Sequence, residues 1–583
     1  MTPDFHLTVV RDGPEDGAPT LRIQTSRATS LGSIPDGSIL VAMLGTVGQE
    51  AAASVLAQAF RDDPYQQHCS VRGTASCVVL DQRSGTVIAI APPIGHQQVF
   101  WSSGANSINF ASRPVVLADL SDAPPKIRLD ALFQYVYFRM VPSPDTIFEN
   151  IYKLDGGHRL RWEGGETRAT RYWQPQFNET ATFTESEASA ELHRVLRLSV
   201  ERALGSTNAA GTFLSGGLDS SSVTGFAAQC RPGITSVTMG FAARGYDETE
   251  YARIASRKFG TTPLEYCVTP DAVLSTLQTI SAAFPEPFGN SSAAAVYHCG
   301  RVSRECGLDL LLAGDGGDEL FGGNERYAKQ MIFERYRKIP GTVRRAVIEP
   351  LLQGATQVTS AFPIGKAASY VQQANIPLPD RLESYNFLHR HAPEEIFAEE
   401  LLAQVDSSAP LQQLRDEFSV PNNASTVNRM MFLDWKFTLH DNDLVKVNNM
   451  CRLAGIDVAY PMLDTAVIDF SLRLPGDWKV RRGQLRWFYR RAMRHFLPHE
   501  IIKKKKHGFG LPFGVWTRTH DGLRRLSEDA LAALGERGYF RPEFLQHALR
   551  LHRYGHASYY GELVWILMVL EFWLQKHLPT ARL

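Results

Sequence analysis

The chain lacks several features that mark particular classes of protein. It has no net charge, because 61 lysine and arginine residues balance 61 aspartate and glutamate residues. A neutral chain gives no general electrostatic support for binding nucleic acid. The seven cysteines are odd in number and no two have CxxC spacing, which argues against a disulfide framework and a zinc site. These features favour the reducing environment of the cytoplasm.

Long hydrophobic runs are absent as well. The most apolar stretch, residues 563–570, lies between Glu562 and Glu571 and is too short to cross a bilayer, so we expect a buried helix. Residues 1–10 have no basic patch followed by a long apolar run, and we expect no signal peptide. With 583 residues, the chain is too long for one hydrophobic core, which predicts two or three domains.

The predicted secondary-structure pattern of the chain changes near residue 180. Before it, short β-rich runs separated by turn residues predict strands, as at residues 71–80 and 86–91. A polar stretch follows, and residues 187–204 then have helical periodicity. Beyond it, apolar strands alternate with helices, which predicts a parallel sheet that binds a nucleotide at the carboxyl ends of its strands. The predicted strands are residues 211–214, 234–241, 264–268 and 308–313, and from about residue 325 the pattern is mostly helical.

A serine- and glycine-rich loop follows the first of these strands. Residues 215–222 read Ser-Gly-Gly-Leu-Asp-Ser-Ser-Ser and lead into a helix. Glycines let the backbone approach a ligand closely, and a helix N-terminus attracts anions. Asp219 repels phosphate, so we interpret it as a ligand of Mg²⁺ that bridges to the phosphates. The string is similar to the pyrophosphate loop of N-type ATP pyrophosphatases; the alternative is a loop that only caps the helix.

A second glycine-rich loop is acidic. It follows the strand at residues 308–313 and places Asp315, Asp318 and Glu319 within five residues. Carboxylates this close repel one another unless a cation shares them. Together with Asp219 they predict a Mg²⁺–pyrophosphate site, and the alternative is an acidic surface turn.

The two loops give the chain a specific resemblance. Ser-Gly-Gly-Leu-Asp-Ser-Ser at residues 215–221, followed by Gly-Asp-Gly-Gly-Asp-Glu-Leu-Phe-Gly-Gly at 314–323, resembles the synthetase domain of the asparagine synthetase family. Segments at residues 246–248, 285–288, 458–464 and 506–512 resemble further segments of that family, in the same order. The resemblance implies a ligase that adenylates a carboxylate with ATP, releases pyrophosphate and transfers the acyl group to ammonia or an amine.

The same resemblance implies roles for individual residues. Asp219 and Asp318 would bind Mg²⁺, Asp315 would contact the acyl-adenylate and the amine, and Lys506 would offset charge on the α-phosphate. We interpret the preceding Lys503, Lys504 and Lys505 as a solvated basic run. ATP would be held by Leu214, Ser215, Gly216, Gly217, Leu218, Asp219, Ser220 and Ser221, with Met239 and Gly314 lining the adenine pocket.

The N-terminal part resembles the glutaminase half of the same family. Residues 110–112, 141–148, 152–158 and 171–173 carry this likeness. Glutaminase chemistry in the family needs a cysteine directly after the initiator methionine, whereas this chain has Thr2 and Pro3. The segments that hold glutamine in the family are not recognisable here. We therefore expect a scaffold that does not hydrolyse glutamine, with Cys69 and Cys77 as core residues.

These observations predict an α/β protein of two domains. The first, residues 1–177, is expected to be a degenerate αββα amidohydrolase-like domain. The second, residues 190–583, is expected to be an adenine-nucleotide α-hydrolase-like ATP pyrophosphatase domain, with a parallel sheet and a helical C-terminal part. We expect a cytoplasmic protein with ATP and Mg²⁺ as cofactors, no nucleic-acid partner and no membrane; a homodimer is left open.

Several substrates and functions stay open. Ala459 stands where many asparagine synthetases carry arginine, which weakens the case for free aspartate. A peptide or specialised metabolite is the alternative carboxylate, as in the lasso-peptide cyclases and β-lactam synthetases that resemble this family. A tRNA-modifying thiolase and a non-catalytic ATP-binding relative are further alternatives. Neutral charge speaks against the thiolase, and the retained acidic residues speak against a non-catalytic relative.

Overall fold

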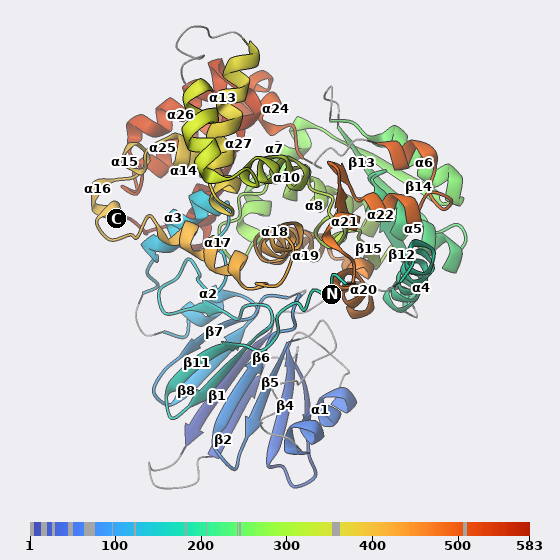
Figure 1. The fold of residues 1–583 in the computed structure, drawn as a ribbon. Coiled ribbons are helices and arrows are strands. Elements are labelled where there is room, and N and C mark those ends of the chain that lie inside the picture. The colour runs from blue at the N-terminus through green and yellow to red at the C-terminus, as the bar shows by residue number, and fades with distance from the viewer. Residues whose placement is uncertain are drawn as a thin grey trace.

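The computed structural model describes residues 5–12, 20–25, 29–44, 50–62, 76–95, 97–121, 124–180, 183–205, 207–241, 243, 246–352, 362–504 and 510–583. Two antiparallel sheets form the N-terminal half, in blue at the bottom of Figure 1. A parallel sheet surrounded by helices forms the rest.

The N-terminal half contains a five-stranded and a six-stranded antiparallel sheet. The first has the strand order β2-β1-β8-β7-β9, and the second has the order β11-β10-β6-β5-β4-β3. The strands are β1 (His6–Asp12), β2 (Thr20–Thr25), β3 (Thr29–Ser33), β4 (Ile39–Leu44), β5 (Cys77–Asp81), β6 (Thr86–Ile90), β7 (Phe100–Ser103), β8 (Ser107–Ala111), β9 (Tyr152–Lys153), β10 (His158–Glu163) and β11 (Glu166–Arg171).

The two sheets pack face to face and helices cover their outer faces. Leu7 and Phe110 of the first sheet share one buried cluster with Leu80 and Trp162 of the second. Helix α1 (Glu50–Asp62) packs on the other face of the second sheet. Helices α2 (Pro114–Ala118) and α3 (Leu129–Phe138) lie beyond the first sheet, in the large core shared with the C-terminal half. The predicted αββα architecture is confirmed.

The cysteines agree with the sequence prediction where the structure describes them. Cys77 is fully buried in β5, and no disulfide joins the cysteines of the described ranges. Thr2, Pro3 and Cys69 lie outside those ranges.

A five-stranded parallel sheet organises the second half, with the order β14-β13-β12-β15-β16. Its strands are β12 (Ala210–Phe213), β13 (Thr235–Phe241), β14 (Thr262–Val268), β15 (Leu310–Leu312) and β16 (Asp457–Ala459). The chain builds outward from β12 to β14 and then returns to place β15 on the other side of β12. This reversal makes a topological switch point, and a ligand crevice is expected at the carboxyl ends of β12 and β15.

Helices flank this sheet on both sides. Helices α5 (Leu218–Cys230), α6 (Thr249–Phe259) and α8 (Ala293–Glu305) pack on its strands, as does α19 (Leu444–Ala454). The same domain contains α4 (Glu185–Leu204), α7 (Pro270–Ala283) and α9 (Gly317–Phe321). Helix α4 starts with a capping box, in which Thr184 Oγ1 accepts from Glu187 N–H and Glu187 Oε2 accepts from Thr184 N–H at 2.7 Å. Helix α6 ends at Gly260, whose φ of 64° suits a left-handed cap.

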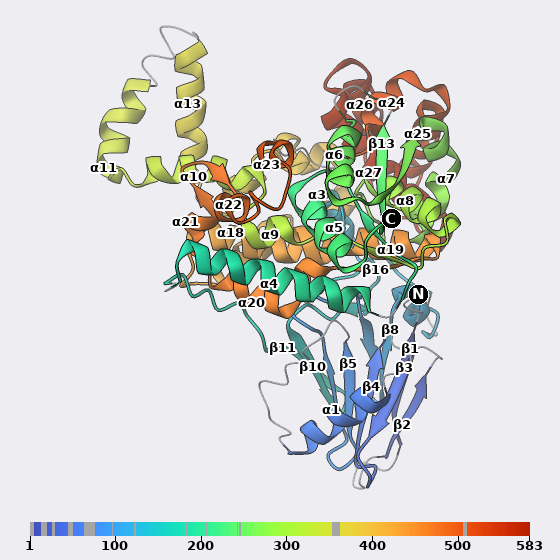
Figure 2. The same ribbon diagram turned by 90° about the vertical axis from the view of Figure 1, so that its right-hand side faces the viewer.

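The C-terminal part is helical, as the sequence predicts. Its elements are α10 (Glu325–Arg337), α11 (Gly341–Val343), η1 (Arg344–Ile348), α13 (Phe362–Asn375), η2 (Asp380–Glu383), α14 (Phe387–Arg390), α15 (Pro393–Ile396), α16 (Glu399–Leu402), α17 (Ala409–Ser419), α18 (Thr426–Asp434), η3 (Trp435–Asp443), α19 (Leu444–Ala454), η4 (Pro461–Leu463), α20 (Thr465–Leu472), α21 (Gly476–Lys479), the hairpin β17 (Val480–Arg481) and β18 (Gln484–Leu485), α22 (Trp487–Ala492), α23 (His499–Lys503), α24 (Phe513–Thr519), α25 (Asp521–Gly535), α26 (Pro542–Tyr554) and α27 (Ala557–His577). Helices α11 and α13 project from the body (Figure 2).

Helix α27 contains the most apolar stretch of the sequence. At 21 residues it is long and apolar enough to cross a membrane by length and composition alone. Its residues are instead packed inside the molecule: Trp565, Leu570 and Trp573 are each at most 1% exposed. The prediction of a buried helix is confirmed.

Buried polar contacts join the two halves. Ser143 Oγ lies 2.9 Å from Asp155 Oδ1 and 2.9 Å from Asp441 Oδ2 of η3, and Lys436 of η3 forms an ion pair with Asp155. Farther along the same interface, Lys153 Nζ lies 2.6 Å from Glu286 Oε2. The N-terminal domain is therefore attached to elements that also line the candidate site.

Candidate active site

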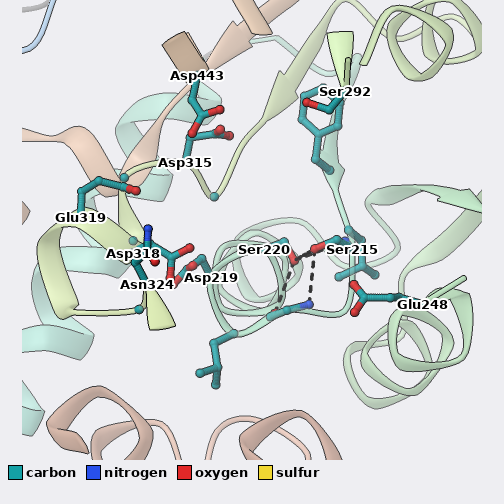
Figure 3. Close-up of a pocket in the computed structure, with 18 of the residues that line it drawn as sticks. Ser215, Asp219, Ser220, Glu248, Ser292, Asp315, Asp318, Glu319, Asn324 and Asp443 are labelled. Carbon is teal, nitrogen blue, oxygen red and sulfur yellow. Dashed lines mark hydrogen bonds between the residues drawn. The ribbon is translucent and has the colours of Figure 1, made fainter. Parts of the chain in front are cut away.

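The serine- and glycine-rich loop joins β12 to α5 at the switch point. Gly216 takes a positive φ of 69°, which glycine adopts without steric cost. Ser215 Oγ lies 3.0 Å from Ser220 Oγ and accepts a 3.4 Å hydrogen bond from Gly217 N–H (Figure 3). The loop thus closes tightly and places the N-terminus of the 13-residue helix α5 at Leu218. This arrangement presents hydroxyls and N–H groups to an anion.

The acidic loop joins β15 to α9 and lies directly against the first loop. A Cβ atom at Gly314 would lie 2.7 Å from Ser220 N, and one at Gly317 would lie 2.3 Å from Asp219 Cγ. Glycine at both positions allows this approach, because any side chain would separate the two loops. The loops come together because β12 and β15 are neighbours in the sheet.

Both loops line one cavity of about 660 Å³. Gly216 does not line it, because this glycine packs against Tyr251 and Ala252 of α6. Ser221 is fully buried and does not line the cavity. Lys506 lies outside the described residues. The predicted site residues that line the cavity are Leu214, Ser215, Gly217, Leu218, Asp219, Ser220, Met239, Gly314, Asp315 and Asp318.

The two predicted metal ligands converge on one point. Asp219 and Asp318 lie side by side in Figure 3, and both form ion pairs with the guanidinium of Arg486. Two carboxylates that share one cation are placed to share a metal ion, so their geometry fits Mg²⁺. Within the described ranges no group of three or more acidic, histidine or cysteine side chains could hold a metal. A metal at this place would therefore need further oxygen ligands from phosphate or water.

Part of the cavity wall is acidic. Asp315, Glu319 and Asp443 line it together with Lys446, whose Nζ lies 2.6 Å from Asp443 Oδ1. Burial, reinforced by Asp443, raises the pKa of Asp315 to about 6. Burial, again with Asp443, raises the pKa of Glu319 to about 8. Carboxyl groups with raised pKa values can exchange protons near neutral pH, which suits acid–base chemistry.

One prediction about the basic run is wrong. Lys504 is not solvated: its side chain is 8% exposed, and its Nζ lies 3.0 Å from Glu248 Oε2 and 3.4 Å from Ser215 O. Glu248 and Lys504 both line the cavity beside the serine loop. Lys503 is exposed, as predicted, and Lys505 lies outside the described residues.

Sequence reasoning missed Arg486, Asp443 and Lys446. Arg486 follows a short hairpin in a region read as helical, and no glycine-rich motif marks it. Asp443 and Lys446 are three positions apart at the junction of η3 and α19, so their side chains lie on one helix face. That spacing is the one signal that could have identified the pair.

Comparison with known proteins adds family information to this geometry. The asparagine synthase family model matches residues 191–575, and the glutamine amidotransferase domain model matches residues 46–173. Asparagine synthetase [glutamine-hydrolyzing] 1 of Bacillus subtilis (strain 168) is 22% identical over 535 residues, covering 91% of this chain and 81% of the relative. A putative asparagine synthetase [glutamine-hydrolyzing] of Mycobacterium bovis is 24% identical over 530 residues, covering 86% and 76%.

Likeness to solved structures is weak. A glutamine-dependent NAD⁺ synthetase from Acinetobacter baumannii, in complex with ADP, is 17% identical with a TM-score of 0.19, covering 53% of this chain and 65% of that one. A score this low carries no argument. The family match, in contrast, covers about two thirds of the chain and includes both cavity loops. The chain belongs to the asparagine synthase family of ATP-dependent amide-forming ligases.

Proposed function

We propose that the chain activates a carboxylate with ATP as an acyl-adenylate, releases pyrophosphate and transfers the acyl group to ammonia or an amine. The observation that carries this proposal is the meeting of the Ser215–Ser220 loop with Asp315 and Asp318 around one cavity. The serine loop suits phosphate groups, and the acidic loop supplies carboxylates for a metal and for proton transfer. In this proposal the serine loop and Asp219 form the nucleotide end of the cavity, and Asp315, Asp443 and Lys446 form its acceptor end.

At the nucleotide end, Ser215, Ser220 and the N–H groups at the start of α5 would bind phosphate oxygens. Met239, at the carboxyl end of β13, would pack against the adenine. Asp219 and Asp318 would hold Mg²⁺, which neutralises charge on the pyrophosphate leaving group when bound. Lys504 holds Glu248 and the carbonyl of Ser215, and so positions the serine loop. Lys506 stays a proposal for offsetting charge at the α-phosphate.

At the acceptor end, Asp315 would take a proton from the attacking amine. Its pKa of about 6 leaves it mostly ionised at neutral pH yet able to accept a proton. Asp443 raises that pKa and Lys446 lowers it, so the ion pair between Asp443 and Lys446 tunes the base. The amine nitrogen would then attack the acyl carbon of the acyl-adenylate, forming the amide C–N bond as the bond from that carbon to the phosphate oxygen breaks and AMP leaves.

A peptide or specialised-metabolite carboxylate is a second candidate substrate, favoured by the surroundings of Ala459. Ala459 pairs with Leu312 in the sheet and its carbonyl accepts from Ala313 N–H at 2.8 Å, next to the acidic loop. Its methyl group offers no charge to a free α-carboxylate. Among the described residues of the acceptor end, Lys446 is the cation, and it is already paired with Asp443.

We also propose that the N-terminal domain does not hydrolyse glutamine. Thr2 and Pro3 stand where the family resemblance calls for a cysteine nucleophile. Ammonia or a substrate amine should therefore support product formation, and glutamine alone should not. The test is glutamate release from glutamine by the purified full chain, compared with Thr2→Ala; release that this substitution removes would refute the proposal.

Pyrophosphate–ATP exchange tests the main proposal. Free aspartate and peptides with an aspartate or glutamate side chain should be compared as carboxylates, and the active one should drive exchange and AMP formation. Asp219→Ala should abolish exchange. The matched control is Asp469→Ala, because Asp469 is exposed and does not line the cavity. Release of ADP and phosphate instead of AMP would contradict the assignment.

A further inference from the structure

Arg486 occupies the point at which the carboxylates of Asp219 and Asp318 meet. Its Nη1 donates to Asp219 Oδ1, and its Nη2 donates to Asp219 Oδ2 at 2.5 Å and to Asp318 Oδ1. The Arg486 side chain is 5% exposed, so these bonds form largely out of water. A bidentate guanidinium–carboxylate pair is among the stronger interactions of a protein. The guanidinium of Arg486 therefore already offsets the charge of Asp219 and Asp318, the proposed metal ligands.

The backbone is built to deliver this guanidinium. Arg486 directly follows the β17–β18 hairpin and takes the left-handed conformation, with a φ of 53° and a ψ of 38°. Its N–H donates to Gly322 O at 3.2 Å, which ties it to the acidic loop. A Cβ atom at Gly323 would lie 2.3 Å from Arg486 Nε, so glycine there makes room for the side chain. A left-handed non-glycine residue persists only where its surroundings enforce it.

We propose that Arg486 is an internal counter-ion that competes with a divalent metal for Asp219 and Asp318 until a nucleotide binds. This inference rests on the proposed metal site at those two residues. A metal ion arriving alone would displace the guanidinium and leave a buried cation without a partner, which is unfavourable. Phosphate oxygens of an incoming nucleotide would give the guanidinium a new anionic partner. Metal and nucleotide should therefore bind with strong positive coupling.

Manganese binding to the full chain tests this competition, since the electron paramagnetic resonance signal of free Mn²⁺ is lost on binding. After subtraction of the Mn²⁺ that α,β-methylene-ATP binds without protein, the wild type should bind Mn²⁺ weakly alone and tightly with the nucleotide. Arg486→Met should bind Mn²⁺ without nucleotide about tenfold or more tightly than the wild type, with reduced coupling. Arg486→Lys keeps the charge but cannot bridge both carboxylates, so its affinity should be intermediate.

The matched control is Arg481→Met. Arg481 lies on the same hairpin with its guanidinium 4.4 Å from the Trp487 ring centroid, so the substitution removes an equal charge without touching the aspartates. Its Mn²⁺ affinity should equal that of the wild type. Equal affinity of the wild type and the folded Arg486 variants without nucleotide would overturn the inference but leave the metal site intact. Absence of nucleotide-dependent Mn²⁺ binding in the wild type would overturn the metal site and, with it, the inference.

Discussion

Buried cations in this chain differ in whether a carboxylate accompanies them. Arg486 has two carboxylate partners. Burial acts to lower its pKa, but Asp219 and nearby acidic groups outweigh burial and raise it. Lys479 is 1% exposed and donates to the amide oxygen of Asn428 at 2.9 Å, which carries no charge. Burial lowers the pKa of Lys479 to about 7. The difference predicts how each residue affects stability.

Lys479 should make stability depend on pH between about 7 and 10.5. In this window the unfolded chain binds the proton and the folded chain does not, so the free energy of unfolding rises with pH. The gain across the window should be on the order of 5 kcal/mol. Urea unfolding at a series of pH values should show this slope in the wild type and its loss in Lys479→Met. Equal slopes in both proteins would contradict the low pKa.

Lys504 should matter for nucleotide binding because it fixes the serine loop. Removing its contacts with Glu248 Oε2 and Ser215 O frees both groups beside the phosphate site. We expect Lys504→Met to weaken binding of α,β-methylene-ATP about tenfold, measured by calorimetry. Lys503→Met is the control, since Lys503 is the exposed neighbour with the same charge. Equal losses in the two variants would return Lys504 to a general basic run.

At the scale of elements, the sequence identified the parts whose chemistry is local. The two glycine-rich loops were predictable because strand, glycines and helix are consecutive in the chain, and β12, β13, β14 and β15 were predicted with boundaries within two residues. Strand β16 was not predicted, since Asp457-Val458-Ala459 has only two apolar residues and lacks the longer apolar run that marks β15 at residues 308–313. Its place beside β15 follows only from the folded sheet.

The residues that complete the site come from elements distant in sequence. Arg486 lies beyond residue 480, and Asp443 and Lys446 lie at the end of a π-helix, so neither group is marked by a motif near the two loops. Lys504 was misinterpreted for the same reason. It stands among other lysines in the sequence, but its side chain contacts a loop almost 300 residues earlier. Tertiary packing brings these positions to the site, and although the spacing of Asp443 and Lys446 indicates a pair on one helix face, it does not show that the pair lies beside the two loops.

The close approach of the two loops predicts a severe effect of one methyl group. Gly314→Ala would place Cβ 2.7 Å from Ser220 N and 2.9 Å from Asp219 C, both backbone atoms that cannot turn away. The loops should separate, and binding of α,β-methylene-ATP should fall at least about tenfold. Gly365→Ala is the control: nothing lies within 4 Å of its added Cβ in α13, and helix propensity should raise stability slightly. Unchanged nucleotide affinity in Gly314→Ala would contradict the tight packing.

At the scale of the whole molecule, the N-terminal domain shares a hydrophobic core with the C-terminal domain. Helix α3 shares one hydrophobic core with helices α4, α5 and α8 of the C-terminal domain. Helix η3 carries residues of the interface between the domains as well as Asp443 of the cavity. Asp441 and Lys436 of η3 contact Ser143 and Asp155 of the N-terminal domain. Removal of the N-terminal domain would expose this core and release η3, so we expect the C-terminal domain to depend on it for stability.

The Lys153–Glu286 pair should couple the stability of the two halves. Lys153 belongs to β9, and Glu286 lies between α7 and α8, where its Oε1 also accepts from Ile147 N–H at 2.8 Å. Both side chains are less than 10% exposed, so Glu286→Gln leaves a buried ammonium without a charged partner and should lower the free energy of unfolding by about 3–5 kcal/mol. The double variant Lys153→Met/Glu286→Leu removes both charges and should recover most of this loss.

Urea unfolding followed by tryptophan fluorescence and by circular dichroism should give coincident transitions in all three proteins. A double variant as unstable as the single one would show that the loss comes from packing and not from the unpaired charge.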